Sequence, residues 1–352
     1  MKLVIQIPCL NEAGHLPATL AGLPRAVPGF DAVEWLVIDD GSTDGTSEVA
    51  RAHGVDHVVR LPYNQGLAKA FMAGLQECLR VGADVIVNTD ADNQYDASSI
   101  PDLTAPILDG RARIVIGARP IDEIAHFSLF KRRLQRLGSW VVKKASGADV
   151  ADAPSGFRAI HREAALRLYV FNSFTYTIET IIQAGRNGIP IVSVPVRVNG
   201  ETRPSRLFKG NLSYVCRSLI TITRIAILYK PLRIFAMLSL AIALPGVAAI
   251  ARFVFFYMSG DGSGHIQSLA VAAGLVSVAA IVGMGGLIAD LIAANRVLLE
   301  EIRTRQLIAS LERSADNPQH ALVGRLPWPM RNDTTQGNTT TERPPFDVSK
   351  AG

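Results

Sequence analysis

The stretch Thr89-Asp90-Ala91-Asp92-Asn93-Gln94-Tyr95-Asp96 follows directly on the apolar run Val85-Ile86-Val87. The apolar run predicts a buried strand, and carboxylates at its end would lie at the edge where open α/β sheets bind ligands. Asp90 and Asp92 share one face of an ideal strand, and Gln94 joins them if the backbone stays extended. These oxygen ligands suit Mg²⁺ or Mn²⁺. The alternative is a solvated, Asp-rich turn.

Apolar runs alternate with helical patterns on both sides of this stretch. Strands are expected at 2–8, 34–38, 55–61, 85–87, 114–116, 157–160 and 191–196, and helices at 15–22, 66–81, 98–108, 176–188 and in a segment ending at His53. Thr43 or Asp44 is expected to cap the helix that ends at His53. This alternation predicts an α/β fold, with a mostly parallel sheet and helices on both faces.

The composition points to a membrane. Hydrophobic residues make up 48% of the chain and the mean hydropathy is +0.22, with the excess concentrated at 233–294. The net charge is +5, and Lys and Arg gather at 197–233. This distribution favours anionic lipid or phosphate ligands over nucleic acid, for which the chain carries no recognisable module. The three cysteines have no metal-binding spacing, so buried thiols are expected.

Two segments are long and apolar enough to cross a bilayer. The first, 234–257, covers roughly 36 Å as a helix, and the second is expected at 269–289. The loop between them lacks Lys and Arg, so the positive-inside rule places both termini in the cytoplasm. Arg252 and Asp290 lie near the ends of these spans and are interpreted as anchors rather than an ion pathway. No signal-peptide pattern follows Met1, so a cytoplasmic N-terminal domain is expected.

The expected organisation has five parts. It comprises a cytoplasmic α/β domain at 1–210, an interfacial amphipathic helix at 211–232, two transmembrane helices within 233–294, a cytoplasmic helix at 295–313 and a disordered tail at 314–352. A basic helical pattern at 127–141 fits either an ordinary surface helix or one lying against the membrane interface. Small residues at Ala279, Gly283 and Gly286 predict a close helix contact, which could join two subunits into a homo-oligomer.

Four motifs occur in order along the N-terminal half. They are Pro8 with Asn11-Glu12, then Asp39-Asp40-Gly41-Ser42-Thr43-Asp44-Gly45-Thr46, then Asp90-Ala91-Asp92-Asn93-Gln94, then Asp152 with Ser155-Gly156-Phe157-Arg158. This ordered set resembles glycosyltransferase family 2, whose fold is called GT-A. It is most similar to the polyprenyl-phosphate sugar synthases, a group that includes dolichol-phosphate mannose synthase and bacterial relatives with two C-terminal membrane helices.

The resemblance implies a donor site for a nucleotide sugar. Its residues would be Pro8, Asn11, Glu12, Asp39, Asp40, Asp90, Ala91 and Asp92, with Asp90, Asp92 and Gln94 holding the divalent metal. A metal at the diphosphate neutralises the charge that develops on the leaving group. Without the resemblance, Asp39 and Asp40 could instead cap a helix, although Asp44 is better placed for that, and Glu12 could be an exposed loop carboxylate.

The acceptor side is predicted from charge. A lipid phosphate is largely deprotonated at neutral pH and needs positioning more than a strong base. Arg119, Arg132 and Arg133 are expected to grip it, with Arg203, Arg206 and Lys209 closing from the loop before the membrane. The later cluster fits contact with anionic lipid equally well. It also departs from the Gly-x-Ser-Lys type of segment that many relatives carry, because residues 200–207 read Gly-Glu-Thr-Arg-Pro-Ser-Arg-Leu.

The expected catalytic residues are Asp152 and Asp92, which the resemblance implies, and Arg119, which the charge argument indicates. Asp152 would be a base or, alternatively, a structural ion-pair partner of Arg158. The expected activity is metal-dependent, inverting transfer of a sugar from a UDP- or GDP-linked donor to polyprenyl phosphate at the cytoplasmic face of the inner membrane. The alternatives are transfer to a glycolipid hydroxyl, or a non-catalytic membrane scaffold with a decayed transferase domain. The sugar, the base and the polyprenol stay open.

Overall fold

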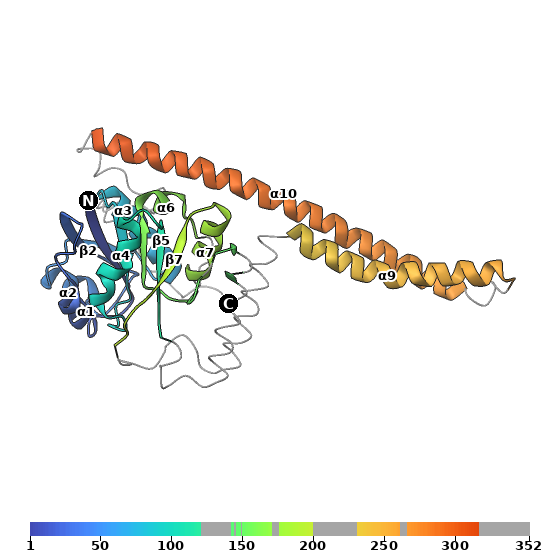
Figure 1. Ribbon diagram of the computed structural model, residues 1–352, viewed down its shortest axis with the longest axis horizontal. Coiled ribbons are helices and arrows are strands. Elements are labelled where there is room, and N and C mark those ends of the chain that lie inside the picture. The colour runs from blue at the N-terminus through green and yellow to red at the C-terminus, as the bar shows by residue number, and fades with distance from the viewer. Residues whose placement is uncertain are drawn as a thin grey trace, which may run out of the picture. The chain divides into compact units, whose positions relative to one another are not determined.

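The computed structural model describes residues 1–120, 142–143, 146–148, 150–170, 176–199, 231–260 and 266–316. The strands are β1 (Lys2–Cys9), β2 (Ala32–Asp39), β3 (His57–Arg60), β4 (Val85–Asn88), β5 (Ile114–Ala118), β6 (Arg158–His161) and β7 (Ile191–Pro195). The helices are α1 (Leu16–Gly22), α2 (Thr46–Ala52), α3 (Leu67–Arg80), η1 (Ala97–Ser99), α4 (Ile100–Leu108), α6 (Arg162–Arg167), α7 (Thr177–Arg186), α9 (Pro231–Met258) and α10 (Ile266–Asp316). Figure 1 shows their arrangement.

The described strands form one seven-stranded sheet in the order β3-β2-β1-β4-β6-β5-β7. All neighbours pair in parallel except β6, which runs antiparallel between β4 and β5. The predicted mostly parallel sheet is therefore confirmed. The six parallel strands bring their carboxyl ends to one edge, and β6 begins at that same edge.

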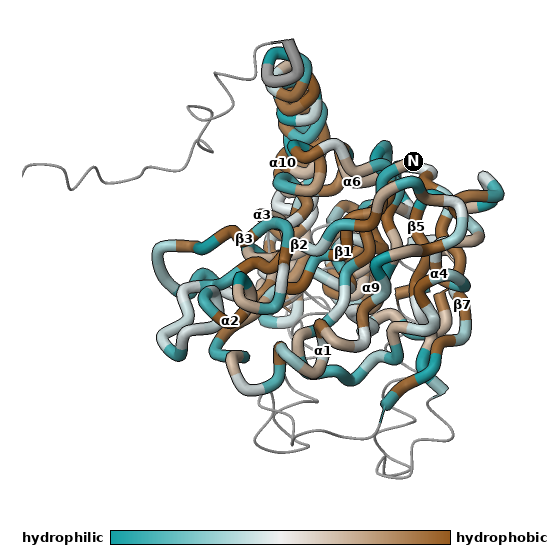
Figure 2. Tube along the Cα trace, turned by 90° about the vertical axis from the view of Figure 1, so that its left-hand side faces the viewer, coloured by the Kyte–Doolittle hydropathy of each residue, from teal (hydrophilic) through white to brown (hydrophobic). Residues whose placement is uncertain are grey.

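Helices cover both faces of the sheet because side chains alternate along each strand. In β1, Val4 packs with residues of α3, α6 and α7, whereas Leu3, Ile5 and Ile7 pack with residues of α1, α2 and α4. Figure 2 shows the hydrophobic strands at the centre of the domain. Cys9 and Cys78 are buried in these two clusters, as predicted, while Cys216 lies outside the described residues.

The extended backbone of β4 does not continue into the acidic stretch. β4 stops at Asn88, and a turn follows in which Asn93 has a left-handed φ of 57°. Asp90 and Asp92 therefore lie on a turn rather than on one face of an extended strand. The backbone is also not extended as far as Gln94, so Gln94 reaches the site only by way of this turn. The backbone turns because Asp92 Oδ1 accepts a hydrogen bond from Gln94 N at 3.2 Å.

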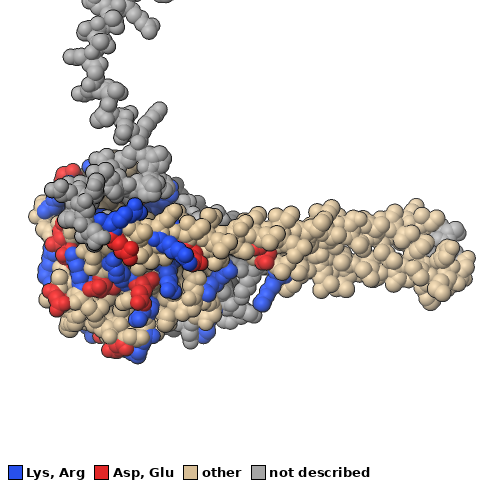
Figure 3. All heavy atoms as spheres, turned by 90° about the horizontal axis from the view of Figure 1, so that it is seen from above, with Lys and Arg blue, Asp and Glu red and all other residues tan. Residues whose placement is uncertain are grey.

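Helices α9 and α10 are both long and apolar enough to cross a membrane. The expected second span and the expected cytoplasmic helix form one continuous α10, with no break between them. The small residues face α9 of the same chain: Ser239 Oγ donates to Ala279 O at 2.8 Å, and a Cβ on Gly286 would meet Phe235 Cβ at 2.6 Å. Figure 3 shows charged side chains gathered on the α/β domain and uncharged surface along the paired helices.

Several sequence-based expectations fall outside the described residues. These are all of the basic helical pattern at 127–141, all but the last two residues of the interfacial helix at 211–232, and nearly all of the tail at 314–352. By its contacts the chain forms two compact units, Met1–Leu311 and Glu312–Gly352, and every site considered below lies in the first. The short helix α6 had no clear signal in the sequence.

Replacing Asn88 by Ala is expected to lower the free energy of unfolding by about 2 kcal/mol. Asn88 is fully buried; its Nδ2 donates to Gly156 O and Tyr176 Oη, and its Oδ1 accepts from Gln6 Nε2. The variant leaves these groups buried without that partner. Thermal unfolding in detergent measures the effect against Asn187→Ala, an exposed asparagine after α7. Equal shifts for both variants would contradict the assignment.

Candidate functional site

The residues of the four motifs meet at the carboxyl edge of the sheet. β1 ends at Cys9, β2 at Asp39, β4 at Asn88 and β5 at Ala118, while Arg158 opens β6 opposite Asn88. Asp39 is the last residue of β2, Asp90 and Arg119 follow β4 and β5, and Asp152 precedes β6. Parallel topology places such residues together although they are far apart in the chain. The structure thus brings Asp39, Asp90, Arg119 and Asp152 to one edge.

Asp90 lies close to Gly156, where a side chain would be crowded. A Cβ on Gly156 would lie 3.1 Å from both carboxylate oxygens of Asp90 and from Tyr176 Oη. Gly156 N donates to Tyr95 Oη at 3.1 Å, and the Tyr95 ring stacks on Phe157. Burial raises the pKa of Tyr95, so its hydroxyl is protonated at neutral pH. The carboxylate of Asp90 is therefore held between two chain segments.

The turn after Asp90 is held from two sides. Thr19 Oγ1, from α1, donates to Ala91 O at 2.8 Å. Asn199 N donates to Gln94 O, and Asn199 Nδ2 donates to Asn93 O, both at 2.9 Å. Asp92 and Gln94 are partly buried on this turn. A turn braced in this way can hold oxygen ligands in a fixed position.

The donor set of this turn fits a hard divalent cation. Asp90 and Asp92 supply carboxylates and Gln94 an amide oxygen, which suit Mg²⁺ or Mn²⁺ when phosphate oxygens and water complete the shell. Within the described ranges, no group of three or more His, Cys, Asp and Glu side chains could hold a metal ion alone. A metal here would depend on oxygens from a ligand, which is the usual arrangement for Mg²⁺ at phosphates.

Asp39 and Asp40 have internal partners. Asp39 is 1% exposed; it accepts from Ser42 N at 2.7 Å and from Ser47 Oγ. Asp40 accepts from Gln65 N at 2.7 Å and from Gly66 N at 2.8 Å. Burial raises the pKa of Asp40, against the opposing effect of these two N–H groups. The two carboxylates fix the loops after β2 and β3 that border the site.

The first motif is tied to the second. Asn11 N donates to Ser42 Oγ, and Asn11 Oδ1 accepts from Thr43 N, both at 2.9 Å. Glu12 is buried; its N–H donates to Thr46 Oγ1, and one carboxylate oxygen lies 3.4 Å from His15 Nδ1. Pro8 is buried in β1. Glu12 is thus not the exposed loop carboxylate considered as an alternative.

The predicted cap by Thr43 or Asp44 is corrected: Gly45 is the N-cap residue of α2 and makes no side-chain cap hydrogen bond, and Asp44 precedes it. The Asp44 carboxylate accepts from Thr46 N at 3.1 Å, at the start of α2, and from Ala13 N at 3.0 Å. Burial acts to raise the pKa of Asp44, but the hydrogen bonds from the Thr46 side chain and from these two N–H groups outweigh it, so the pKa is lowered. The Asp44 carboxylate thus joins the first motif to the start of α2.

Asp152 forms an ion pair with Arg119. Arg119 Nε donates to one carboxylate oxygen at 2.7 Å and Nη2 to the other at 3.1 Å, in a bidentate fork. Asp152 is fully buried and the Arg119 side chain is 14% exposed. Burial acts to lower the pKa of Arg119, but Tyr95 and Asp152 outweigh it and raise the pKa. The sequence placed both residues in the site without predicting that they pair.

Arg158 instead supports the loop that carries Asp152. It is 1% exposed, and its guanidinium donates to Ser155 O, Ala153 O and Thr177 O, each at 2.8 Å, and to Thr180 Oγ1 at 2.7 Å. These acceptors lie on the loop before β6 and on α7. The ion pair that the structure shows for Asp152 is therefore with Arg119, and Arg158 joins its loop to α7.

The other proposed acceptor residues, Arg132, Arg133, Arg203, Arg206 and Lys209, lie outside the described residues. Sequence reasoning missed Asn88, Tyr95 and Tyr176, which surround Gly156. Tyr95 follows the acidic stretch directly and could have been inferred from that position. Tyr176 is distant in sequence and carried no signal.

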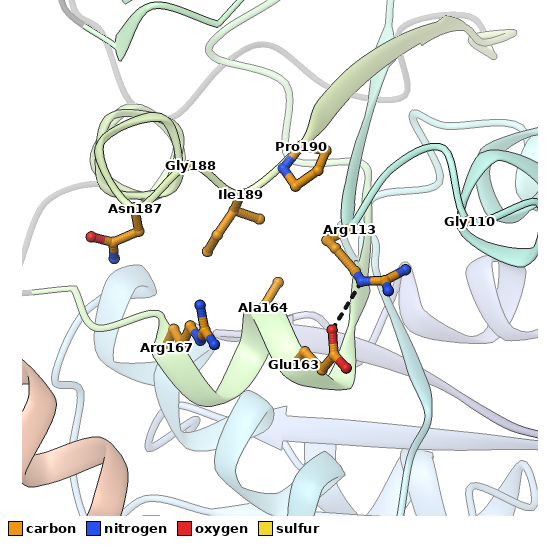
Figure 4. Close-up of a pocket in the computed structure, with 9 residues that line it drawn as sticks. All are labelled: Gly110, Arg113, Glu163, Ala164, Arg167, Asn187, Gly188, Ile189 and Pro190. Carbon is orange, nitrogen blue, oxygen red and sulfur yellow. Dashed lines mark hydrogen bonds and ion pairs between the residues drawn. The ribbon is translucent and has the colours of Figure 1, made fainter.

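A cavity of about 240 Å³ lies at the opposite edge of the sheet, beside the starts of β5 and β7. Figure 4 shows Arg113, paired with Glu163 at 3.0 Å, and Arg167 and Asn187 around this cavity. None of the motif residues lines it. Its position excludes it from the candidate site.

Comparison with known proteins supplies a family. Residues 4–168 match the model of "Glycosyl transferase family 2". An uncharacterised glycosyltransferase of Mycobacterium tuberculosis is 33% identical over 214 residues, covering 59% of this chain and 92% of the relative. An undecaprenyl-phosphate mannosyltransferase of Micrococcus luteus is 29% identical over 235 residues, covering 64% and 93%. An undecaprenyl-phosphate 4-deoxy-4-formamido-L-arabinose transferase of Yersinia pestis is 29% identical over 297 residues, covering 81% and 86%.

Gly156→Ala is expected to weaken binding of Mn²⁺ in the presence of a nucleoside diphosphate by about tenfold, because metal ligands must be held within ~0.5 Å of their working geometry. The added Cβ would push on the Asp90 carboxylate. Titration of the Mn²⁺ electron paramagnetic resonance signal measures the change. Gly22→Ala is the control, since a Cβ there meets no atom within 4 Å. Unchanged affinity in Gly156→Ala would contradict the prediction that Gly156 positions Asp90 for the metal.

Asp44→Asn should remove a pH-dependent part of the stability. Because the folded pKa of Asp44 lies below the unfolded value of about 3.9, its contribution is present above that value and is lost as the pH falls through the folded pKa. The wild type should exceed the variant in unfolding temperature at neutral pH, and the difference should shrink below about pH 4. A difference that does not vary with pH would contradict a lowered pKa of Asp44 in the folded protein.

Proposed function

This chain belongs to glycosyl transferase family 2, and we propose that it transfers a sugar from a nucleotide-diphosphate donor to polyprenyl phosphate at the cytoplasmic face of a membrane. The observation that carries the proposal is the edge of the sheet where Asp90, held against Gly156, lies in the same site as the Arg119–Asp152 pair. The acidic turn with Asp90 has the oxygen ligands for a metal-bound diphosphate. Arg119 supplies a cation for the phosphate of the acceptor.

Asp90, Asp92 and Gln94 would hold the divalent metal, Mg²⁺ or Mn²⁺. When bound, the metal supplies charge neutralisation at the leaving diphosphate. The loops fixed by Asp39 and Asp40 would form the nucleoside pocket, with Pro8, Asn11, Glu12 and Ala91 completing it. In this arrangement Asp39 and Asp40 act mainly by shaping the pocket, because their carboxylates already accept hydrogen bonds from their own loops.

The Arg119–Asp152 pair favours a phosphate acceptor over a hydroxyl. A general base needs a carboxylate that can reach and accept the acceptor's proton. Asp152 is fully buried and both of its oxygens accept from Arg119, which makes it a poor base and a good anchor for the guanidinium. A lipid phosphate needs no base, because it is already ionised at neutral pH. Arg119 would grip its oxygens, and Asp152 would orient Arg119.

The membrane and the relatives support the acceptor class. The names of the Micrococcus and Yersinia relatives describe transferases that act on undecaprenyl phosphate. Helices α9 and α10 would keep the site close to such a lipid, with both termini in the cytoplasm by the positive-inside rule. We infer inversion at the anomeric carbon, giving a β-linked product. The small residues Ala279 and Gly286 of α10 pack against α9 of the same chain, so these residues do not by themselves support a homo-oligomer.

The test is a screen of UDP- and GDP-linked sugars with polyprenyl phosphate in liposomes and Mg²⁺ or Mn²⁺, scored by lipid-extractable product. Asp92→Ala should lower the rate at least about a hundredfold, because a metal contributes several kcal/mol at the transition state. Asp102→Ala, an exposed acidic residue on α4, is the control.

The screen also separates the rival functions. No donor consumed by the wild type under any of these conditions would defeat the proposal and favour a scaffold. Product formed only with a glycolipid that lacks a phosphate monoester would identify a hydroxyl acceptor.

A further inference from the structure

Helix α10 continues beyond the membrane span and lies against the α/β domain (Figure 1). The second apolar span is expected to end near Ala289, and seven residues further on Arg296 forms an ion pair with the domain. From there to Leu311 the helix contacts α6, α7 and the segment between them. At ~1.5 Å per residue these contacts begin about 10 Å and end about 33 Å beyond the span.

The first of these contacts is a buried ion pair. Arg296 Nη2 donates to Glu179 Oε1 of α7 at 3.0 Å, and Arg296 Nε donates to Glu300 Oε1 at 3.0 Å. The exposed fractions of the three side chains are 14%, 6% and 16%. A charge pair with so little solvent contact requires a fixed geometry, because removing one partner leaves an uncompensated buried charge.

The later contacts hold the same face of the helix. Arg303 lies over the Tyr169 ring, 4.1 Å from its centre, and Nη1 donates to Leu168 O at 3.3 Å. Burial lowers the pKa of Arg303. Thr304 Oγ1 donates to Leu166 O, and Leu307 and Leu311 pack on the domain core. Polar and apolar contacts together fix both the rotation and the axial position of α10.

The contacted helix α7 also supports the candidate site. Thr177 O and Thr180 Oγ1 accept from the Arg158 guanidinium, which holds the loop that carries Asp152. Tyr176, directly before α7, accepts from Asn88 beneath the acidic turn. Glu179 therefore joins the helix that leaves the membrane to the element that braces the acceptor side of the site.

We propose that residues 296–311 of α10 are a positioning element that holds the acceptor side of the site at a fixed height and orientation above the bilayer, with Arg296–Glu179 as its main attachment. This inference rests on the proposed function, since it concerns delivery of a membrane-embedded acceptor. α10 is continuous from the membrane span to the domain, so it transmits position directly. Neither Arg296 nor Glu179 is among the residues proposed to bind the donor, the metal or the acceptor.

The first experiment compares two acceptors with the same phosphate group: polyprenyl phosphate in liposomes, and a short isoprenyl phosphate in solution. Arg296→Ala and Glu179→Ala should each lower the transfer rate to the liposome acceptor at least tenfold. They should change the rate with the soluble acceptor and the Kd for the nucleoside diphosphate less than twofold. Arg296→Lys should restore much of the liposome activity because it keeps the charge.

Arg305→Ala is the matched control. Arg305 pairs with Glu301 on the same helix with the same spacing, but its side chain is 78% exposed and the pair faces solvent. It should change neither rate. Equal losses on both acceptors would show that the Arg296–Glu179 pair only maintains the domain, and unchanged liposome activity would show that the pair positions nothing. Either result overturns the inference.

The second experiment measures a distance and does not depend on sugar transfer. Spin labels at Asp109→Cys and Leu298→Cys, in a Cys216→Ser background, report the distance from the domain to α10 in lipid nanodiscs. The wild type should give one narrow distance distribution, broadened in Arg296→Ala and unchanged in Arg305→Ala. A broad distribution in the wild type would refute fixed positioning. If the wild type transfers sugar to neither acceptor, the proposed function fails, and this measurement still tests the attachment.

Discussion

The antiparallel pairing of β6 with β4 is the constraint on which the candidate site depends. It places Arg158 opposite Asn88 and so brings the loop that carries Asp152 and Gly156 beside the acidic turn after β4. In an all-parallel sheet, the segment before the neighbouring strand would enter from the far edge. Here the reversed strand delivers a preceding loop, rather than a following one, to the edge where the other strands end.

Two buried polar side chains keep this juxtaposition in place. Asn88 connects β1, the Gly156 loop and Tyr176, and Arg158 connects the Asp152 loop to α7. Buried polar groups are costly unless they are hydrogen-bonded, and those bonds specify one arrangement of the chain. Asp39 and Asp40 in turn hold the loops that border the site.

Much of this could be predicted from local sequence. Apolar runs between turn residues located every described strand, the ordered motifs located Asp90 and Asp152, and the charge argument located Arg119. Contacts between distant segments could not be predicted in the same way. Nothing near Asp152 indicates Arg119 as its partner, because the pairing depends on how β5 and β6 adjoin. The sequence predicted a membrane span and a separate charged helix, whereas the structure has the single helix α10. No Gly or Pro lies between Gly286 and Asp316 to end the helix.

The central proposal is that the acidic turn after β4 holds a divalent cation and, through it, the diphosphate of the donor. Anomalous diffraction at the manganese edge, from crystals grown with Mn²⁺ and UDP or GDP, measures this directly. We expect one strong peak within coordination distance of Asp90 or Asp92, about 2.0–2.3 Å from its ligand oxygens, with diphosphate density beside it. Diphosphate density with no manganese peak at this turn, or a peak elsewhere in the domain, would contradict the account.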